Sequence, residues 1–555
     1  MKVFKFGSLA LALALSACGG DNGSASSSAQ TDDTAAPEDT KTGVFTDSAV
    51  ANIQYQTETQ SGFTNALGEY EYVEGETVTF SIGGIELPPV PATGRVTPAD
   101  MTAVESSTDQ LTNILRLLQS LDEDGNPDNG ITITAETHTA LENALLVVDQ
   151  PAAEFEAQFA NEVATTVSKT LISAEEAEAH FYASQKADLR GSWVFVEPAG
   201  ESSNGQGPDG EEVNVLTFLD GGTYILAHKY GNDDQGAATA EWGTYTWDPA
   251  TGALTVTVLG ESEGGEGGLC PGLAVDVGDC TETVQLVGDE LHFGSEAAAA
   301  TPFQSIEDAG NPYVGAWYLP EGEGFNVLTI LDDSHYVIAH NANGEVYAGD
   351  DLVAVSSEWG TYSVASGSFQ VTGVEKETDG PGGLYDASGT GGVSAASEVT
   401  AYGDLQLEPS GDAMIALRKV GRFSVELSDL AGNTSSIIVE RTGDRFANGV
   451  SKAFEFDLVG ENDAAEVTLE SNATGSVTYL ADNESTLIDA WSVNAAGTLA
   501  YEETNPADSS TGSWVFAPIK TGDGKEWALV DFRHIDGTTE SLLGFYISEL
   551  KPLPQ

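Results

Sequence analysis

The sequence has few basic residues. It contains 20 lysines and arginines against 88 aspartates and glutamates, which gives its 555 residues a formal net charge of −68 at pH 7. This charge repels phosphate backbones and anionic membrane surfaces, so nucleic acid is not an expected partner and cations are better candidates. Because hydrophobic residues make up 40% of the sequence, we expect packed domains with acidic surfaces, and solubility in a salty medium is enough to account for the acidity.

Long hydrophobic runs are also missing. The run at residues 9–15 follows Lys2 and Lys5 and is far shorter than the roughly 20 residues that a membrane-spanning helix needs. A basic start before a short apolar run is typical of an export signal, here residues 1–17. The next segment, residues 18–42, has almost no large apolar side chains, so we expect a flexible tether.

The export signal ends in Leu15, Ser16, Ala17 and Cys18. These four residues resemble the bacterial lipobox, in which the signal is cut before the cysteine and the cysteine carries a lipid. Gly19 follows, where an aspartate would favour retention in the inner membrane of a Gram-negative cell. The resemblance therefore implies an outer-membrane lipoprotein, at the periplasmic face or the cell surface, whose contact with the membrane is the lipid on Cys18.

Cysteines are scarce, and apart from Cys18 the sequence has only Cys270 and Cys280. Two cysteines in an exported protein usually pair, so we expect a disulfide that closes a local loop. A metal or redox role would need further ligands nearby, and no histidine or third cysteine supplies them.

Sequence signatures of catalysis are absent as well. The chain has no Gly-x-Ser-x-Gly elbow, no His-Glu-x-x-His, no phosphate loop and no dinucleotide fingerprint. Its histidines are too scattered for spacing to identify a nucleophile and its base: His138, His180, His228, His292, His335, His340 and His534. The sequence therefore predicts a non-catalytic protein, with no catalytic residues and no cofactor other than a structural cation.

Residues 43–96 alternate apolar and polar side chains between glycine turns. Val78, Phe80 and Ile82 share one face of a strand, as expected for short antiparallel strands. The stretch from Thr64 to Gly84 resembles carboxypeptidase regulatory-type or transthyretin-like sandwich modules of secreted proteins. That resemblance implies an N-terminal β-sandwich.

Residues 97–188 change to a helical period. Apolar residues recur at helical spacing from Leu111 to Leu121, after a capping pair formed by Ser107 and Gln110. Further helices are expected at residues 135–148, 152–171 and 175–189, the last with Ser173 and Glu176 as its capping pair.

A polar loop follows the first predicted helix. Asp122, Asp124, Asn126 and Asp128 place oxygen side chains at every second position, a spacing that suits Ca²⁺. The loop resembles thrombospondin type 3 and EF-hand-type loops, although Ile133 stands where an EF-hand has its twelfth-position acid. The alternatives are a structural calcium site and a polar turn between helices.

The sequence from residue 214 to 245 is repeated at 326–363. Asn214, His228 and Trp242 correspond to Asn326, His340 and Trp359, and each copy ends in Glu-Trp-Gly-Thr-Tyr. Each unit also starts with Gly-x-Trp, and together with the later Gly-Thr-Tyr this resembles lipocalin-like small barrels. The resemblance implies barrels at residues 189–310 and 311–420, and a divergent third unit at 421–555.

These observations predict a mainly β, multidomain chain. It has an N-terminal β-sandwich, a small helical insert and two to three tandem antiparallel lipocalin-like β-barrel units. The repeated His228, Trp242, His340 and Trp359 are either ligand contacts or copies of packing residues. The expected function is binding or adhesion at the cell surface, with an unknown surface, protein or glycan as partner. The alternatives are a carrier or sensor of small apolar ligands and an envelope hydrolase.

Overall fold

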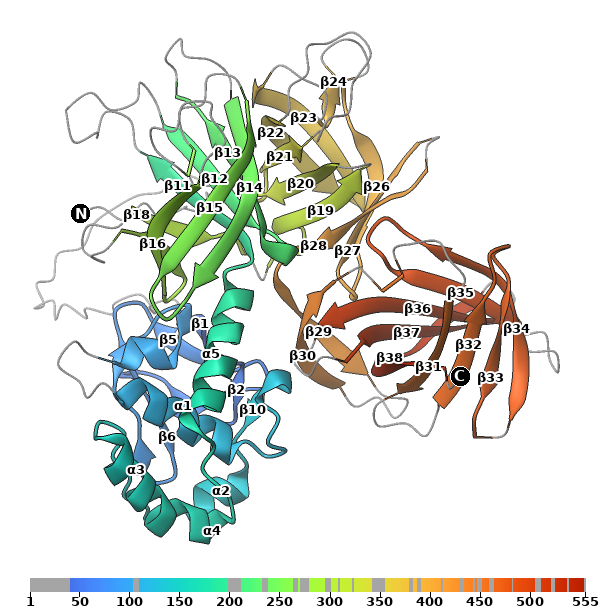
Figure 1. The fold of residues 1–555 in the computed structure, drawn as a ribbon. Helices are drawn as coiled ribbons and strands as arrows, with labels where there is room; N and C mark the ends of the chain where they lie inside the picture. Colours follow the sequence, from blue (N-terminus) through green and yellow to red (C-terminus); the bar gives the residue numbers. More distant parts are fainter. Residues whose placement is uncertain are drawn as a thin grey trace, which may run out of the picture. The chain divides into compact units, whose positions relative to one another are not determined.

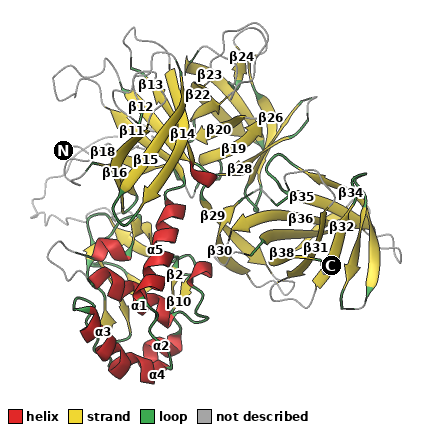
Figure 2. Cartoon of the chain, in the orientation of Figure 1, coloured by secondary structure: helices red, strands yellow, loops and turns green. Residues whose placement is uncertain are grey.

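The computed structural model is mainly β, with three closed eight-stranded antiparallel barrels and a small helical region (Figures 1 and 2). This confirms the predicted fold class. The structure describes residues 40–102, 109–197, 211–231, 238–262, 268–269, 279–294, 301–307, 310–321, 324–341, 355–378, 383–386, 391–410, 413–428, 434–442, 445–446, 452–458, 464–481, 483–504, 511–520, 525–536 and 539–553. The predicted export signal and most of the predicted tether lie outside these ranges.

The first barrel runs up and down, and its first and last strands pair to close it. Its strands are β11 (Gly191–Glu197), β12 (Glu212–Phe218), β13 (Thr223–Lys229), β14 (Ala238–Asp248), β15 (Ala253–Glu261), β16 (Asp279–Val287), β17 (Glu290–Phe293) and β18 (Thr301–Ser305). Alternate residues face inward, and large side chains fill the interior, among them Trp193, Phe218, Tyr224 and Trp247. Each such side chain contributes roughly 2 kcal/mol through its burial.

The second barrel repeats this plan. Its strands are β19 (Gly315–Glu321), β20 (Gly324–Ile330), β21 (His335–Asn341), β22 (Val355–Ala365), β23 (Ser368–Glu377), β26 (Ser394–Val399), β27 (Asp404–Pro409) and β28 (Ile415–Lys419), with β24 (Tyr385–Asp386) paired to β25 (Gly391–Gly392) outside the ring. The repeated Glu-Trp-Gly-Thr-Tyr forms a bulge in each barrel, at Gly243 in β14 and at Gly360 in β22. A Cβ on Gly243 would lie 2.0 Å from the carbonyl oxygen of Thr257, so this position excludes a side chain.

The first two barrels pack side by side through their repeated strands. The outward faces of β12 and β13, which carry Val215 and Ala227, share a hydrophobic core with the second barrel. The hydroxyl of Ser357 on β22 donates to the carbonyl oxygen of Thr239 on β14 at 2.9 Å. The stretch that the sequence repeats is therefore also the stretch through which its two copies meet.

The third barrel is preceded by a hairpin that does not belong to its ring. The hairpin is formed by β29 (Arg422–Ser428) and β30 (Thr434–Arg441), and β30 pairs with β36. The ring consists of β31 (Lys452–Leu458), β32 (Ala464–Leu469), β33 (Gly475–Tyr479), β34 (Glu484–Val493), β35 (Leu499–Thr504), β36 (Thr511–Lys520), β37 (Trp527–Asp536) and β38 (Thr539–Pro552). The pairing of β31 with β38 closes it.

A buried ion pair connects the second barrel, the hairpin and the third barrel. Arg441 at the end of β30 contacts Asp404 at the start of β27, and both side chains have no exposed surface. The guanidinium also donates to the carbonyl oxygen of Ala496 at 3.0 Å and to the hydroxyl of Thr498 at 2.8 Å, both between β34 and β35. The other carboxylate oxygen of Asp404 accepts from Asn494 at 2.9 Å and from Thr498 at 2.8 Å.

The N-terminal region contains small sheets that share one hydrophobic core with the helices. Phe45 and Phe80 come from different sheets and stack with their ring centroids 4.2 Å apart. The strands are β1 (Thr40–Phe45), β2 (Val50–Ala51), β3 (Gln54–Gln56), β4 (Ser61–Phe63), β5 (Glu69–Val73), β6 (Thr77–Ile82), β7 (Ile85–Glu86), β8 (Val90–Pro91), β9 (Arg95–Val96) and β10 (Ile131–Thr132). Their sheet orders are β5-β1-β9, β10-β2 and β4-β3-β6-β7, with β8 on β6.

The helices are α1 (Gln110–Leu121), α2 (Ala135–Ala140), α3 (Ala152–Phe159), α4 (Thr165–Val167) and α5 (Ala174–Asp188), with a π-helical turn (Ala160–Ala164) between α3 and α4. The capping box of Ser173 and Glu176 is present, whereas Ser107 lies outside the described residues. The helix expected to run to residue 148 ends at Ala140. Asn113 of α1 donates to the carbonyl oxygen of Val148 at 2.9 Å, so this carbonyl is bonded to α1 and not within a helix of its own. Among the described residues, no helix has the length and apolar character needed to span a membrane.

Candidate functional sites

In each of the first two barrels, the long connections between strands all lie at one end. In the first barrel, the long ones span residues 198–211, 230–237, 262–278 and 294–300, whereas those at the opposite end span 219–222, 249–252 and 288–289. In the second barrel, the connections at 342–354 and 378–393 are the long ones, and they lie at the corresponding end. We call these the long-connection ends. Antiparallel neighbours alternate direction, so every second connection must share an end.

The two long-connection ends lie next to each other. Lys229 at the end of β13 pairs with Glu375 near the end of β23, with Nζ and Oε2 3.0 Å apart. Lys376 donates to the carbonyl oxygen of Gly231 at 3.0 Å, and Thr378 donates to that of Ala238 at 2.9 Å. The lateral packing of the barrels therefore brings the strand ends that carry the long connections of both barrels side by side.

A buried histidine lies near each long-connection end. Nδ1 of His228 is 2.8 Å from Oδ1 of Asn214, and Nδ1 of His340 is 2.7 Å from Oδ1 of Asn326. An amide oxygen only accepts, so in both pairs Nδ1 donates. Burial lowers the pKa of His228 to about 4, so its imidazole is neutral at pH 7. Glu212 Oε2 lies 3.7 Å from Nε2 of the same ring.

A buried glutamate anchors a connection in each barrel. The hydroxyl of Tyr224 donates to Oε1 of Glu241 at 2.8 Å, and the N–H of Leu269 donates to the same oxygen at 3.1 Å. Burial raises the pKa of Glu241. A Cβ on Gly268 would lie 2.1 Å from Oε2 of Glu241, so a side chain there would displace the Glu241 carboxylate.

The second barrel repeats this glutamate network. Glu358 accepts from the hydroxyl of Tyr336 at 2.6 Å and from the N–H of Leu384 at 2.8 Å. A Cβ on Gly383 would lie 1.9 Å from Oε2 of Glu358. This network was not predicted from the sequence. The sequence feature that could have indicated it is the Gly-Leu pair at matching positions of the two repeats, Gly268-Leu269 and Gly383-Leu384.

The repeated tryptophans do not join the histidines. Trp242 lies on the outward side of β14, and its ring centroid is 6.0 Å from that of Phe325 in the other barrel. Trp359 is 1% exposed, and Nζ of Lys229 lies 5.5 Å from its ring centroid. The structure therefore places His228 and His340 among inward-facing residues, and Trp242 and Trp359 in the contact between barrels.

The predicted calcium loop brings together only part of its predicted ligands. Asp122 is 1% exposed, and its Oδ2 has no hydrogen-bond partner among the described residues. Burial, followed by the neighbouring Asp124, raises the pKa of Asp122 to about 6. Asn126 donates its backbone N–H to Asp124 at 2.8 Å, whereas Oδ1 of Asp128 points away, 3.1 Å from Nδ1 of His180.

Asp122 and Asp124 therefore suit a cation, but Asp128 does not join them. Lys169 already donates to the carbonyl oxygens of Asp122 and Glu123. In the described part of the chain, no three His, Cys, Asp or Glu side chains are grouped as a metal site requires. Calcium at this loop stays a prediction.

The predicted disulfide and lipid site are only partly within the described chain. Cys280 lies on β16, with its Sγ 3.9 Å from the carbonyl oxygen of Leu269. Cys18 and Cys270 lie outside the described residues. Lipid attachment and the disulfide therefore stay predictions.

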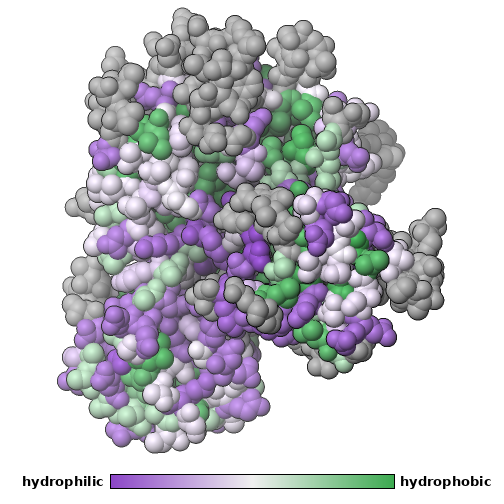
Figure 3. Space-filling model, turned by 45° about the vertical axis from the view of Figure 1, so that its right-hand side comes forward, coloured by the Kyte–Doolittle hydropathy of each residue, from purple (hydrophilic) through white to green (hydrophobic). Residues whose placement is uncertain are grey.

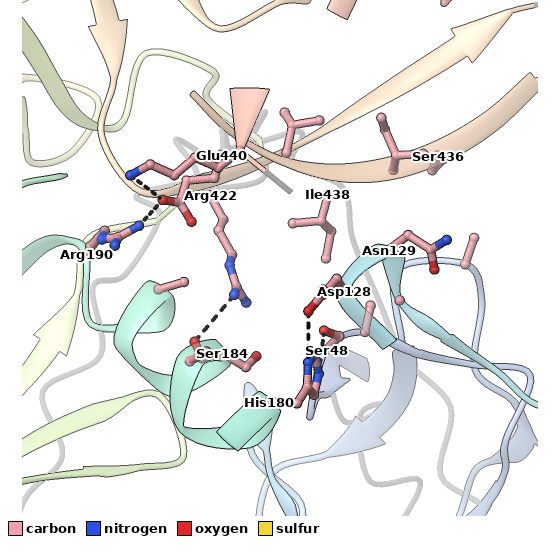
Figure 4. A pocket seen from close by; sticks show the side chains of 18 residues that line it. Ser48, Asp128, Asn129, His180, Ser184, Arg190, Arg422, Ser436, Ile438 and Glu440 are labelled. Atoms are coloured by element: carbon pink, nitrogen blue, oxygen red, sulfur yellow. Dashed lines mark hydrogen bonds and ion pairs between the residues drawn. The ribbon is translucent and has the colours of Figure 1, made fainter. Parts of the chain in front are cut away.

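A cavity of about 250 Å³ lies beside α5. The turn before β2, the loop before β10, and β30 complete its walls, and its charged lining residues are Asp128, His180, Arg190, Arg422, Glu440 and Lys520 (Figure 4). Three of these side chains are cationic, in a chain with only 20 lysines and arginines. Arg190 contacts Glu440, and Arg422 donates to Asp188 at 2.6 Å.

His180 connects two walls of this cavity. Its Nδ1 lies 3.1 Å from Oδ1 of Asp128, and its Nε2 lies 3.2 Å from Oγ of Ser48 (Figure 4). Because the carboxylate only accepts, Nδ1 donates to Asp128, and Nε2 is left to accept from the Ser48 hydroxyl. Sequence spacing could not reveal this group, because residues 48, 128 and 180 are brought together only by folding.

Comparisons with protein-family models, with curated proteins and with solved structures find no match to this chain. Its function must therefore be inferred from its own geometry.

Proposed function

We propose that this protein is a lipid-anchored protein of the bacterial outer membrane that binds a partner through the long-connection ends of its first two barrels. One observation carries the proposal: the barrels pack so that both long-connection ends face the same side, as the contacts from Lys229 to Glu375 and from Lys376 to Gly231 require. A rigid scaffold that presents several long loops together is a common arrangement in binding proteins.

The strand ends below these connections are held firmly. In each barrel, a buried glutamate accepts a backbone N–H from the connection, and a buried histidine is fixed by an asparagine on the neighbouring strand. These contacts fix Leu269, Leu384 and the strand ends from which the connections start, which reduces the conformational entropy lost there on binding.

The charge of the connections favours a polar or cationic partner. Residues 197–212 contain Glu197, Glu201, Asp209, Glu211 and Glu212, and no basic residue. Elsewhere on the chain, hydrophilic residues cover much of the lower part of the face shown in Figure 3.

The carrier hypothesis has less support. The interior of the first barrel holds Trp193, Phe218, Tyr224, Trp247 and Leu254 in one core. Eight-stranded barrels either fill with side chains or enclose a small ligand, and these large residues favour filling. A fluorescent fatty acid should therefore not bind the purified chain.

The anchoring part of the proposal is tested by cell fractionation. Wild-type protein should be found in the outer-membrane fraction, and Cys18→Ala should release it. Protease added to intact cells should digest the wild-type protein if it is exposed at the surface. Protection from protease would overturn a surface-adhesion role.

The binding part is tested by exchanging connections. Replacing residues 342–350 with a Gly-Ser segment of equal length should abolish the attachment of cells that the wild-type protein supports. The matched control replaces residues 249–251 at the opposite end of the first barrel, and it should leave attachment unchanged. Equal attachment by both variants and by cells lacking the gene would contradict the proposal.

A further inference from the structure

We propose that the cavity beside α5 is a hydrolytic site, in which Ser48 is the nucleophile, His180 is its general base and Asp128 positions the base. The site would act on a short carboxylic ester that carries an anionic group. This activity is separate from binding at the long-connection ends.

The geometry meets the requirements for an activated serine. The nucleophile and base lie 3.2 Å apart, and the base lies 3.1 Å from the carboxylate that orients it. The two contacts involve different ring nitrogens, Nε2 toward Ser48 and Nδ1 toward Asp128. This is the order of contacts that lets an imidazole accept the serine proton while a carboxylate holds its tautomer.

Ser48 and His180 are each held by a separate element. Ser48 lies in the tight turn between Thr46 and Ala49, which form an isolated β-bridge. The preceding Asp47 accepts from Gln119 of α1 at 2.8 Å, and this contact secures the turn. His180 belongs to α5, which begins with a complete capping box.

The protonation state of His180 fits a general base. Its ring faces Asp128, Asp47 at 3.9 Å and, across the cavity, Arg422. Burial lowers the pKa of His180 more than the contact with Asp128 raises it. The ring is therefore neutral near pH 7 and can accept a proton.

The cavity indicates the size and charge of the substrate. A volume of about 250 Å³ holds a short acyl chain, and Ala49, Ala183 and Ile438 supply apolar wall. Arg422 lines the same cavity, and its guanidinium donates to Asp188 at 2.6 Å and to the carbonyl oxygen of Ser184 at 3.4 Å (Figure 4). A guanidinium has five N–H donors, so those that remain would bind a carboxylate on the substrate.

The reaction needs no further reagent than water. Oγ of Ser48 attacks the ester carbonyl carbon while its proton passes to Nε2 of His180. The bond from the carbonyl carbon to the alcohol oxygen then breaks, and the alcohol leaves with that proton. Water attacks the acyl-serine, gives a proton to Nε2, and the acid departs as the proton returns to Ser48.

The proposal is tested on the purified full chain with a fluorophosphonate probe and peptide mass spectrometry. We expect the label on Ser48, and Ser48→Ala and His180→Gln should each lower labelling at least about 100-fold. Ser436 lines the same cavity without a hydrogen bond to a histidine in the described structure, so Ser436→Ala should label like wild type. Folded wild-type protein without label on Ser48 would overturn the proposal, as would undiminished labelling of His180→Gln.

Hydrolysis of p-nitrophenyl esters tests the substrate class and the role of Asp128. The half-ester of succinate should be cleaved faster than the neutral propionate ester, and equal rates would overturn the anionic substrate. Asp128→Asn should lower kcat about 100-fold and move the acid limb of the pH–rate profile to lower pH, because the positive charge on His180 loses its partner. An unchanged profile would refute a positioning role.

Discussion

Breaking the buried ion pair between Arg441 and Asp404 should destabilise the chain strongly. Both side chains have no exposed surface. Arg441→Met leaves the Asp404 carboxylate buried, with Asn494 and Thr498 as its donors among the described residues. An uncompensated buried charge costs about 3–5 kcal/mol. For a unit the size of the third barrel with its hairpin, such a loss lowers the melting temperature by about 10 °C.

The assay is differential scanning calorimetry of the full chain, because several domains unfold and one transition cannot be assumed. The pair links the second barrel to a turn of the third. Arg441→Met should therefore lower the melting temperature of the third barrel and separate its transition from those of the other domains. The double variant Arg441→Met with Asp404→Leu should recover about half of the loss. It removes the buried charge but leaves Asn494 and Thr498 without their acceptor.

The control is Lys41→Met, which removes a positive charge from an exposed pair with Glu74. Such pairs contribute about 0.5 kcal/mol, so the melting curve should barely change. If Arg441→Met melts within 1 °C of wild type (about 0.3 kcal/mol), the reasoning about this pair is refuted.

Two further predictions concern the N-terminal region. Ca²⁺ should raise the melting temperature of the full chain by relieving repulsion between Asp122 and Asp124, and Asp122→Asn should abolish the rise. A melting temperature that changes with neither Ca²⁺ nor chelator would rule out the predicted site. Burial raises the pKa of Asp47 to about 7, so the folded state keeps a proton that the unfolded chain releases near pH 4. Stability should therefore fall between about pH 4 and 7, and Asp47→Asn should restore up to about 4 kcal/mol above pH 7. Urea midpoints of both proteins at pH 5 and pH 8 measure this, and equal midpoints at pH 8 would contradict it.

The barrels could be predicted because their signals are local and repeated. Gly-x-Trp at the start of the first two units and the repeated Asn-Val-Leu-Thr both predict strands, and in the first barrel the structure has β11 and β12 there. The capping pair of Ser173 and Glu176 likewise marks the start of α5. Local sequence is sufficient where a pattern and a tertiary contact favour the same element.

The departures from prediction depend on contacts between distant residues. The helix from Ala135 ends at Ala140, and Asn113 binds the carbonyl oxygen of Val148 in the segment that follows, a contact that helical spacing does not encode. The third unit begins with a hairpin outside its ring because β30 pairs with β36 rather than with β31. Ser48 and His180 meet for the same kind of reason, since an active-site geometry can be recognised only after folding.

The first two barrels meet as the subunits of an isologous dimer would, each using the same repeated strands. In this chain the two halves are joined covalently, so their association does not depend on concentration and cannot be lost by dilution. A symmetric dimer must change both of its binding ends at once. In this chain, the connection at residues 198–211 of the first barrel corresponds to residues 322–323 of the second, which are far fewer. Each barrel can therefore change its own connections while the contact between the barrels keeps the two ends together.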